Sequence, residues 1–438
     1  MRTLNFPAPH STILSMPAPL LSFDEASALV AQCASRLSKH EPSRERVSLA
    51  HAAGRVLAEP LWADSDQPPF TRSTRDGFAC RAAQASKYES LALTGSVRAG
   101  DAPAQPLAAG SACEIMTGAP IPDGADAVAM LEHVESDDGR VRLLPPHKLD
   151  PGDNLVVRGV QARAGDELLP AGTPLSAAQI ALAASCGHSS LDVFVRPRVA
   201  ILTTGDELVA EDVVPGPGQI RNSNAPMLAA LVEAAGGEAW VLPTAADNAA
   251  ALDLALAQAV SADMLLISGG VSAGKFDLVE PALERLGAKF HFTGVRIQPG
   301  KPLVFGEIPV QERPLLQKEG RTKCCFGLPG NPISSAVTFL LFAAPVLSAL
   351  ASSRVYGPRF ALAHLAEDHS RSVKAGLTRF LPASCTFSAP GGQLPSVVQI
   401  PMQGSGDLVS FARSNCFLVI PDKDAHLEEG AIVRILLH

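Results

Sequence analysis

Glycine- and proline-rich loops hold most of the residues in this sequence that could bind an anion. Four of them adjoin apolar runs typical of strands, and they read TGDE at 204–207, SGGVSAG at 268–274, PGKP at 299–302 and LPGNP at 328–332. In open α/β sheets, ligands bind outside the carboxyl ends of the strands. Four such loops therefore predict one shared site at those ends rather than four independent turns.

The SGGVSAG loop is typical of a backbone cradle for a phosphate group. Its small residues let N–H groups approach an anion, and the hydroxyls of Ser268 and Ser272 add donors. An ordinary glycine-rich turn between a strand and a helix explains the loop equally well. The loop matches neither the dinucleotide fingerprint nor the P-loop pattern, so those two ligand classes are not indicated.

Charged residues in the same region favour phosphate chemistry with a divalent ion. Asp206 and Glu207 supply oxygen ligands that could share Mg²⁺ with substrate phosphates. Asp277 lies in the first turn of the next predicted helix, where compensation of the helix dipole is its structural alternative. Lys301 is fixed between two prolines, which suits a cation that meets an oxyanion, although a solvated loop lysine is the simpler explanation.

Two turns in an earlier, β-rich part of the chain also carry polar residues. Asp76 lies beside a flexible glycine in STRDGFA at 73–79, and Thr117 lies in MTGAP at 116–120. Taken alone, each motif indicates no more than a turn.

Alternating strand and helix patterns position the four loops. Between 197 and 350, strand runs are separated by helical segments of about 10–15 residues, which predicts βαβ units around a mainly parallel sheet. A helix is predicted over 22–58 with Ser22 as its cap, and another with Asn224 as its cap. The apolar run 333–350 predicts a buried core helix rather than a membrane span, because a proline interrupts it.

The predicted fold class is multidomain α/β plus β, with a central doubly wound α/β domain, a β-rich insert domain and a small C-terminal β domain. Changes of pattern divide the chain into a flexible tail at 1–20, a discontinuous helical and strand region at 21–60 and 151–192, the β-rich domain at 61–150, the α/β domain at 193–351 and the C-terminal β domain at 352–438.

Composition excludes several classes of function. Of the 438 residues, 47% are hydrophobic and 18% are charged, which is typical of a globular protein. The net charge of -8 argues against a general nucleic-acid or anionic-membrane binder. The eight cysteines have neither disulfide-framework nor metal-knuckle spacing, and the N-terminus has no secretory pattern. We therefore expect a cytoplasmic protein with reduced thiols.

Together, seven blocks of the sequence resemble the molybdopterin molybdenumtransferase family, which includes bacterial MoeA and the E domain of eukaryotic gephyrin. They read STRDGFA, MTGAPIPDGADAV, TTGDEL, IRNSN, SGGVSAGKFDLV, QPGKPLVFG and GLPGNPISS, and the resemblance extends over about residues 20–438. It implies an elongated subunit and a homodimer whose active sites use both chains. It also implies that molybdate and adenylylated molybdopterin react with Mg²⁺ to give molybdenum cofactor and AMP, the pterin being handed over from an adenylyltransferase.

The resemblance also assigns roles to residues in these motifs. It implies that Asp76, Glu207, Asp277 and Lys301 are catalytic, and that Glu207, Asp247 and Asp277 bind the metal. The ligand contacts that it implies are Thr117, Gly205, Asp206, Ser268, Gly269, Gly270, Ser272, Gly274, Gln298, Gly300, Pro329, Gly330, Asn331, Pro332 and Ser334.

The chain departs from the family pattern at three places. Arg75 stands where many members have methionine, which adds a positive charge beside the first catalytic aspartate. Gln298 stands where many have lysine, which removes a cation from the molybdate pocket. In PGDNLVVRGVQ, Arg158 is displaced, and Val160 and Gln161 replace two acids. These departures bear on anion affinity and on the first region more than on the fold.

Two other functions stay open from the sequence. One is a nucleotide-anhydride hydrolase that uses the same crevice without molybdenum, and the other is a non-catalytic scaffold of the gephyrin E-domain type. A scaffold needs none of Asp76, Glu207, Asp277 and Lys301, so their joint presence disfavours it. The sequence does not decide between molybdate and tungstate.

Overall fold

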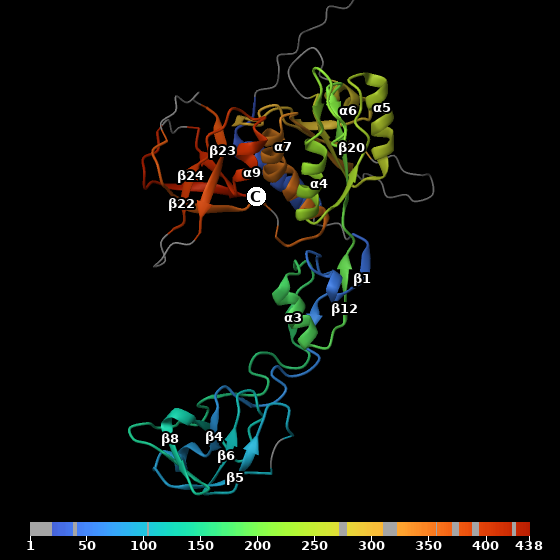
Figure 1. Cartoon of the computed structure of the whole chain (residues 1–438). Helices are drawn as coiled ribbons and strands as arrows, with labels where there is room; N and C mark the ends of the chain where they lie inside the picture. The colour runs from blue at the N-terminus through green and yellow to red at the C-terminus, as the bar shows by residue number, and fades with distance from the viewer. Residues whose placement is uncertain are drawn as a thin grey trace, which may run out of the picture. The chain divides into compact units, whose positions relative to one another are not determined.

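The computed structural model describes residues 20–37, 42–102, 105–270, 278–309, 322–355, 357–369, 376–387, 394–422 and 426–438. The chain divides into two units (Figure 1): unit 1 takes its residues from 1–45, 54–56 and 194–438, and unit 2 from 46–53 and 57–193. The finer division into five parts stays a prediction.

A six-stranded mixed sheet forms the centre of unit 1. In spatial order its strands are β16 (Glu238–Val241), β13 (Arg198–Thr203), β17 (Met264–Ser268), β21 (Thr322–Leu328), β20 (Val304–Pro309) and β18 (Lys289–Phe292). The first four are parallel, whereas β20 and β18 run antiparallel to their neighbours. The sheet is therefore mainly parallel, as predicted.

Helices cover both faces of this sheet, as doubly wound folds require (Figure 1). They are α1 (Phe23–Leu37), α4 (Asn224–Ala234), α7 (Pro332–Thr338) and α8 (Ala344–Leu350) on one face and α5 (Ala249–Gln258) and α6 (Val279–Arg285) on the other, with η3 (Ala259–Ser261) after α5. Successive strand residues point to opposite faces. Accordingly, the adjacent Cys324 and Cys325 pack on opposite faces of the sheet, Cys324 on the face that α1, α4, α7 and α8 cover and Cys325 on the face that α5 and α6 cover. The predicted fold class is confirmed.

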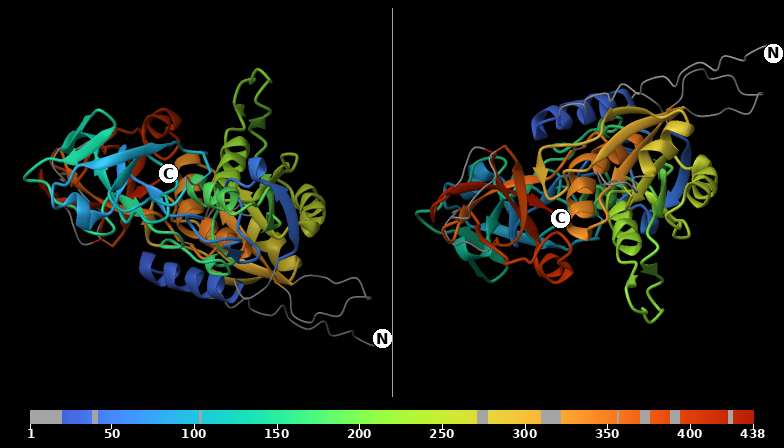
Figure 2. Two further views of the ribbon diagram at one scale, coloured as in Figure 1. Left: turned by 90° about the horizontal axis from the view of Figure 1, so that it is seen from below. Right: turned by 90° about the horizontal axis from the view of Figure 1, so that it is seen from above.

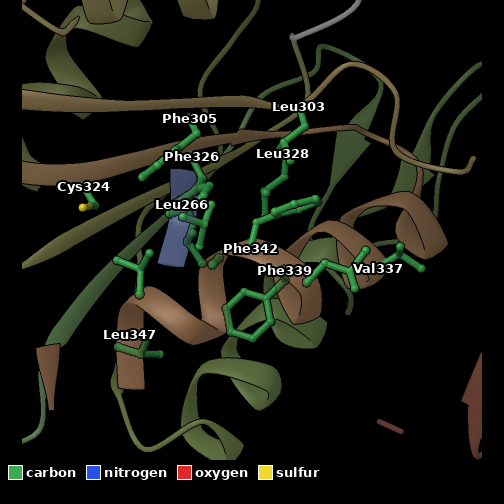
Figure 3. Close-up of a cluster of buried hydrophobic side chains, with 14 of the residues drawn as sticks. Leu266, Leu303, Phe305, Cys324, Phe326, Leu328, Val337, Phe339, Phe342 and Leu347 are labelled. Carbon is green, nitrogen blue, oxygen red and sulfur yellow. The ribbon is translucent and has the colours of Figure 1, made fainter. Parts of the chain in front are cut away.

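The long apolar helix lies at the centre of unit 1 (Figure 3). Its middle, Phe339–Ala343, is a π-helical turn between α7 and α8. Pro345 follows this turn by two residues. Proline has no N–H to donate to a carbonyl of the preceding helical turn, and such a site favours an irregular turn. By length and composition Pro332–Leu350 could cross a membrane, but 78% of its apolar window is buried inside the protein. Its side chains pack with those of the sheet, where the Phe305 and Phe326 rings stack 4.5 Å apart.

Helix α1 begins as the sequence predicts but ends much earlier. The Ser22 N–H and hydroxyl both donate to Glu25 Oε2, at 2.7 and 2.8 Å, and the Glu25 N–H donates to Ser22 Oγ. The prediction of one helix over 22–58 is wrong, because β1 (Arg44–Ser48) and the 3₁₀ turn η1 (Leu49–His51) follow. The buried residues of α1 face the sheet of unit 1.

Removal of this cap should weaken unit 1 measurably. Ser22→Ala removes the hydroxyl that accepts the Glu25 N–H and donates to Glu25 Oε2, and loss of an N-cap costs about 0.5–2 kcal/mol of stability. We expect the urea concentration at the midpoint of unfolding to fall by the amount that corresponds to this free energy. The slope of the unfolding free energy against urea concentration should not change. Ser22→Thr, which keeps the hydroxyl, should stay close to the parent. Equal midpoints for the alanine variant and the parent would show that the cap contributes nothing.

A small β-barrel completes unit 1. Its strands are β22 (Phe360–Leu365), β23 (Thr378–Thr386), β24 (Ser396–Gln399), β25 (Cys416–Ile420) and β26 (Ile432–Leu437), and β19 (Ile297–Gln298) pairs with β23 at its edge. The ladder closes because β23 pairs with both β24 and β25. A short helix, α9 (Leu408–Arg413), interrupts the predicted all-β pattern; Asp407 caps it by accepting the Ser410 N–H.

Unit 2 is the β-rich insert. Its main sheet has the spatial order β7 (Ala127–Met130), β4 (Gly77–Cys80), β6 (Ser111–Ile115), β5 (Leu91–Val97), β9 (Arg140–Leu143) and β8 (Val134–Asp137). The remaining elements are short: β2 (Leu61–Trp62) with β11 (Glu167–Leu169), β3 (Arg72–Ser73) with β10 (Leu155–Val156), β12 (Ser190–Phe194), α2 (Ala82–Ala85), η2 (Leu131–His133) and α3 (Ala177–Ser185).

Candidate active site

The described parts of the four predicted loops meet in one crevice of about 1840 Å³ in unit 1. Parallel strands end at the same edge of a sheet, so the loops after β13, β17 and β21 lie together there. The barrel supplies the opposite wall with the segment 402–406. The predicted site residues that line the crevice are Gly205, Glu207, Asp247, Ser268, Gly269, Gly270, Gln298, Gly300, Lys301, Pro329, Gly330, Asn331, Pro332 and Ser334.

Lys301 reaches this edge for a reason that the sequence did not predict. The PGKP loop does not follow a strand of the central sheet, because β19 before it belongs to the barrel sheet. It precedes β20, whose first residue, Val304, pairs antiparallel with Gly327 near the end of β21. The amino end of β20 therefore lies beside the carboxyl end of β21, and the loop joins the crevice.

Asn224 connects two of the loops, and its predicted role as a helix cap is wrong. It is the first residue of α4, and its Nδ2 donates to Ser268 Oγ at 2.8 Å and to the Gly330 carbonyl at 2.7 Å. The cap-like bond comes instead from Asn222, whose Oδ1 accepts the Ala225 N–H at 3.1 Å. The asparagine side chain thus fixes the distance between the second and fourth loops.

Two buried polar atoms in the crevice wall, Asn224 Oδ1 and Thr204 Oγ1, have no hydrogen-bond partner among the described residues. A buried polar atom without a partner costs about 1–3 kcal/mol. A bound ligand that offers a donor to Asn224 and an acceptor or donor to Thr204 would recover that cost.

The start of the SGGVSAG loop makes a backbone hydrogen bond within the fold. The Gly269 N–H donates to the Leu328 carbonyl at 3.2 Å, so it is not free for a phosphate. The residue has φ +101°, and a Cβ there would lie 2.6 Å from the Thr204 carbonyl oxygen, so only glycine fits. Ser272, Gly274 and Asp277, on which the rest of the predicted cradle depends, lie outside the described residues.

The acidic wall of the crevice consists of Glu207 and Asp247. The Glu207 carboxylate lies against Gly205, with Oε2 2.6 Å from the position of a Cβ on that glycine. Asp206 does not line the crevice; its Oδ1 accepts the Asp247 N–H at 3.0 Å and so positions that residue. Within the described part of the chain, these carboxylates do not form a compact three-ligand metal cluster. Two carboxylates nevertheless suffice for Mg²⁺ when substrate phosphates complete its coordination.

Cationic side chains also line the crevice, and the sequence analysis missed three of them. The cations are Lys301, Arg221, Arg296 and Arg379. Gln298 pairs with Arg379 through β19 and β23, so an arginine stands beside the position where many relatives of the family have lysine. The Arg379 Nε is buried and has no hydrogen-bond partner among the described residues. Arg296 lies two residues before Gln298, and residues with this spacing point to the same side of an extended segment. This spacing was the one feature of the sequence that could have indicated Arg296 as a site residue.

The barrel also contacts the fourth loop directly. Asn331 Nδ2 donates to Ser405 Oγ at 2.9 Å, and the Ile333 N–H donates to the Ser405 carbonyl at 3.0 Å. Pro332 is the first residue of α7 and Asn331 precedes it as the N-cap, although the Asn331 side chain makes no capping bond. The crevice is therefore closed on this side by bonds between two parts of unit 1.

Asp76 and Thr117 lie in unit 2, where they bind each other. Thr117 donates to Asp76 Oδ1 with its N–H at 2.6 Å and its hydroxyl at 2.8 Å. The bond from the Thr117 N–H, followed by that from its hydroxyl, lowers the pKa of Asp76 below its usual value. Asp76 therefore presents an ionised carboxylate, held by the MTGAP turn.

A doubly wound sheet with a crevice at the carboxyl edge of its strands is the arrangement in which open α/β proteins bind their ligands. Comparison with known proteins identifies the family. Three family models match: the MoeA N-terminal region (domains I and II) at residues 21–187, a probable molybdopterin binding domain at 200–349, and the MoeA C-terminal region (domain IV) at 369–438. The chain belongs to the molybdopterin molybdenumtransferase family.

Individual relatives agree with this assignment over nearly the whole chain. A molybdopterin molybdenumtransferase of Nostoc sp. is 34% identical over 430 residues, which cover 95% of this chain and 94% of the relative. That of Haemophilus influenzae is 31% identical over 394 residues, covering 89% and 93%. Two crystal structures of the molybdopterin biosynthesis MoeA protein of Pyrococcus horikoshii match with TM-scores of 0.74 at 28% identity and 0.66 at 31% identity. They cover 96% of this chain and 100% and 99% of theirs.

Proposed function

We propose that this chain inserts molybdenum, supplied as molybdate, into adenylylated molybdopterin and releases AMP. The curated relatives are named for this transfer. The observation that carries the proposal is one crevice lined both by acidic residues, Glu207 and Asp247 (the acidic wall), and by cations, among them Lys301 and Arg379 (the cationic wall). A nucleotide–pterin anhydride with its metal suits the first wall, and an oxyanion suits the second.

On the acidic wall, Glu207 and Asp247 would hold Mg²⁺ together with the phosphates of the adenylylated pterin. The ion would neutralise charge that develops on the phosphate oxygens as the anhydride breaks. Thr204 Oγ1 and Asn224 Oδ1, the buried atoms without partners, would orient the ligand along the sheet edge. Asp277 stays a predicted third acidic residue.

On the cationic wall, Lys301 and Arg379 would hold molybdate. Molybdate is a dianion, and an unpaired charge in a partly desolvated crevice is costly. The buried Nε of Arg379 has an unused donor, and Gln298 beside it adds a neutral amide. In this account, Arg379 provides much of the charge that a lysine at 298 provides in many members of the family.

We also propose a homodimer, in which Asp76 and Thr117 of one chain serve the crevice of the partner. The loop between β14 (Leu208–Val209) and β15 (Ile220–Arg221), here the projecting loop, extends away from the rest of unit 1 in both views of Figure 2. Val214 on it is 82% exposed, and Val213 and Ile220 are also exposed. Apolar residues gathered on such a loop favour a contact with another chain.

Light scattering at micromolar concentration should therefore give twice the 45.6 kDa mass of one chain. Val214→Asp should shift the protein toward the monomer, because it places a charge in the proposed contact. Val355→Asp, at a valine of unit 1 that is 72% exposed and lies outside the projecting loop, is the matched control and should leave the mass unchanged. A monomeric parent protein would contradict the dimer.

We propose that the reaction takes place in the cytoplasm and that an adenylyltransferase hands over the pterin. All eight cysteines are buried free thiols, which suits a reducing compartment. The adenylylated substrate requires an enzyme that makes the pterin anhydride, and transfer between the two would protect it from hydrolysis.

The test is AMP release by the purified protein from adenylylated molybdopterin with Mg²⁺, with and without molybdate. We expect release that depends on molybdate, with sulfate at equal ionic strength as the control anion. Equal release in both conditions would instead establish an anhydride hydrolase. No release in either condition, with substrate bound, would favour the scaffold.

A further inference from the structure

A second cluster of reactive side chains lies in unit 1, away from the crevice. It joins Cys33 on α1 to Glu307 on β20 and Cys324 on β21, and it borders a cavity of about 500 Å³. Cys324 precedes Leu328, the end of β21 at the crevice, by four residues, or about 13 Å along the strand. The cluster therefore needs an explanation of its own.

The three ligand atoms converge in a buried position. Cys33 Sγ lies 3.7 Å from Cys324 Sγ and 3.4 Å from Glu307 Oε1, and all three atoms lie within 4.8 Å of one another. The two cysteines are only 3% and 2% exposed. A carboxylate next to two thiols in the interior is costly unless it is bound.

The surroundings hold Glu307 in its ionised form. Desolvation raises its pKa, but hydrogen bonds from Thr322 Oγ1 at 2.7 Å and His291 Nε2 at 3.1 Å, with the charge of Arg36, lower the pKa below its usual value overall. The hydrogen bond between the two thiols lowers the pKa of Cys33 and, together with burial, raises the pKa of Cys324 well above its usual value. The cluster thus offers a carboxylate beside two thiols, and a bound cation has to displace the proton of Cys324.

We propose that Cys33, Glu307 and Cys324 bind a thiophilic divalent cation such as Zn²⁺, with a water molecule in the fourth position. Two thiolates about 2.3 Å from a tetrahedral ion lie ~3.8 Å apart, and a thiolate and a carboxylate oxygen lie about 3.6 Å apart. The distances of 3.7 Å between the two sulfurs and 3.4 Å between Cys33 Sγ and Glu307 Oε1 match this geometry. Cysteine and glutamate are also ligand types that Zn²⁺ takes.

Arg36 occupies the place of the cation in this structure. Its guanidinium bonds both Glu307 and Cys33, yet its side chain is 56% exposed and can move into solvent. Metal and Arg36 therefore compete for the same carboxylate. A bound ion would connect α1 to β20 and β21 and stabilise unit 1 by mass action.

The test is titration of the reduced full-length protein with Co²⁺, whose absorption reports tetrahedral thiolate coordination, followed by displacement with Zn²⁺. We expect one ion per chain with thiolate-to-cobalt charge transfer. The double variant Cys33→Ser, Cys324→Ser should lose this signal, whereas Cys385→Ser, a buried cysteine of the barrel, should keep it. Zn²⁺ should raise the Tm of the parent but not of the double variant.

Arg36→Ala keeps the proposal testable if the serine variants do not fold. Removal of the competing guanidinium should tighten Co²⁺ binding by about tenfold, a gain that a damaged fold does not produce. Unchanged or weaker binding by Arg36→Ala would overturn the proposal. So would equal Co²⁺ signals in the parent and the double variant, or a Cys33–Cys324 disulfide whose reduction restores both thiols without any Co²⁺ binding.

Discussion

Replacement of Glu207 by glutamine should lower the turnover of AMP release by about 10²–10³-fold, the usual effect of losing one preorganised charge at a reacting group. The side chain is exposed in the crevice, and within the described residues its carboxylate makes no hydrogen bond or ion pair. Its removal should therefore leave the free energy of unfolding unchanged. Its role is to hold Mg²⁺ against the substrate phosphates, so higher Mg²⁺ should restore part of the activity.

Glu284→Gln is the matched control for this variant. Glu284 is an exposed acid on α6 and does not line the crevice. We expect normal turnover from it in the same AMP assay. Near-normal turnover from a stable Glu207→Gln protein would remove Glu207 from the site and leave the acidic wall without its main residue.

The second large effect concerns the molybdate requirement. Lys301→Ala and Arg379→Ala should each raise the molybdate concentration for half-maximal turnover by about 10–100-fold, because a hydrogen bond to a charged group contributes about 1.5–3 kcal/mol. The requirement for adenylylated pterin should change much less. Lys289→Ala, at an exposed lysine of β18 outside the crevice, is the control.

Gln298→Lys should act in the opposite direction, but modestly. A charge in partly solvated surroundings is worth roughly 0.5–2 kcal/mol, and the new lysine would pair directly with Arg379, which opposes part of the gain. Molybdate titrations of the variants and the parent measure all of these effects. If neither Lys301→Ala nor Arg379→Ala moves the molybdate curve, the cationic wall is not the molybdate site.

Local pattern was enough to predict the features that local forces decide. The capping box at Ser22 and the opposite orientations of Cys324 and Cys325 need only neighbouring residues. The loops after β13, β17 and β21 also followed, because parallel strands bring their carboxyl ends together. Once a parallel sheet is assumed, these features place the predicted crevice residues of the three loops that follow its strands.

The remaining features depend on pairings between distant segments. Arg379 enters the crevice through its pairing with Gln298, 81 residues earlier in the chain, and no motif surrounds it. Asn224 looked like a helix cap because its contacts with Ser268 and Gly330 are tertiary. The helix predicted over 22–58 ends at Leu37, and Arg44–Ser48 forms the strand β1.

The metal-site proposal shows the same limit. Cys33 and Glu307 are 274 residues apart, and their spacing resembles no metal motif. Scattered cysteines in the sequence indicated only reduced, buried thiols. Only the packing of α1 against the sheet brings the two sulfurs and the carboxylate together.

The central claim is that this crevice couples anhydride cleavage to molybdenum insertion. The most direct measurement follows AMP and pterin-bound molybdenum together, from adenylylated molybdopterin, Mg²⁺ and molybdate, over a time course. We predict one molybdenum atom incorporated for each AMP released, with both products falling in parallel in Glu207→Gln and Lys301→Ala. AMP released without molybdenum in the pterin product would contradict the claim and establish the crevice as a hydrolase site.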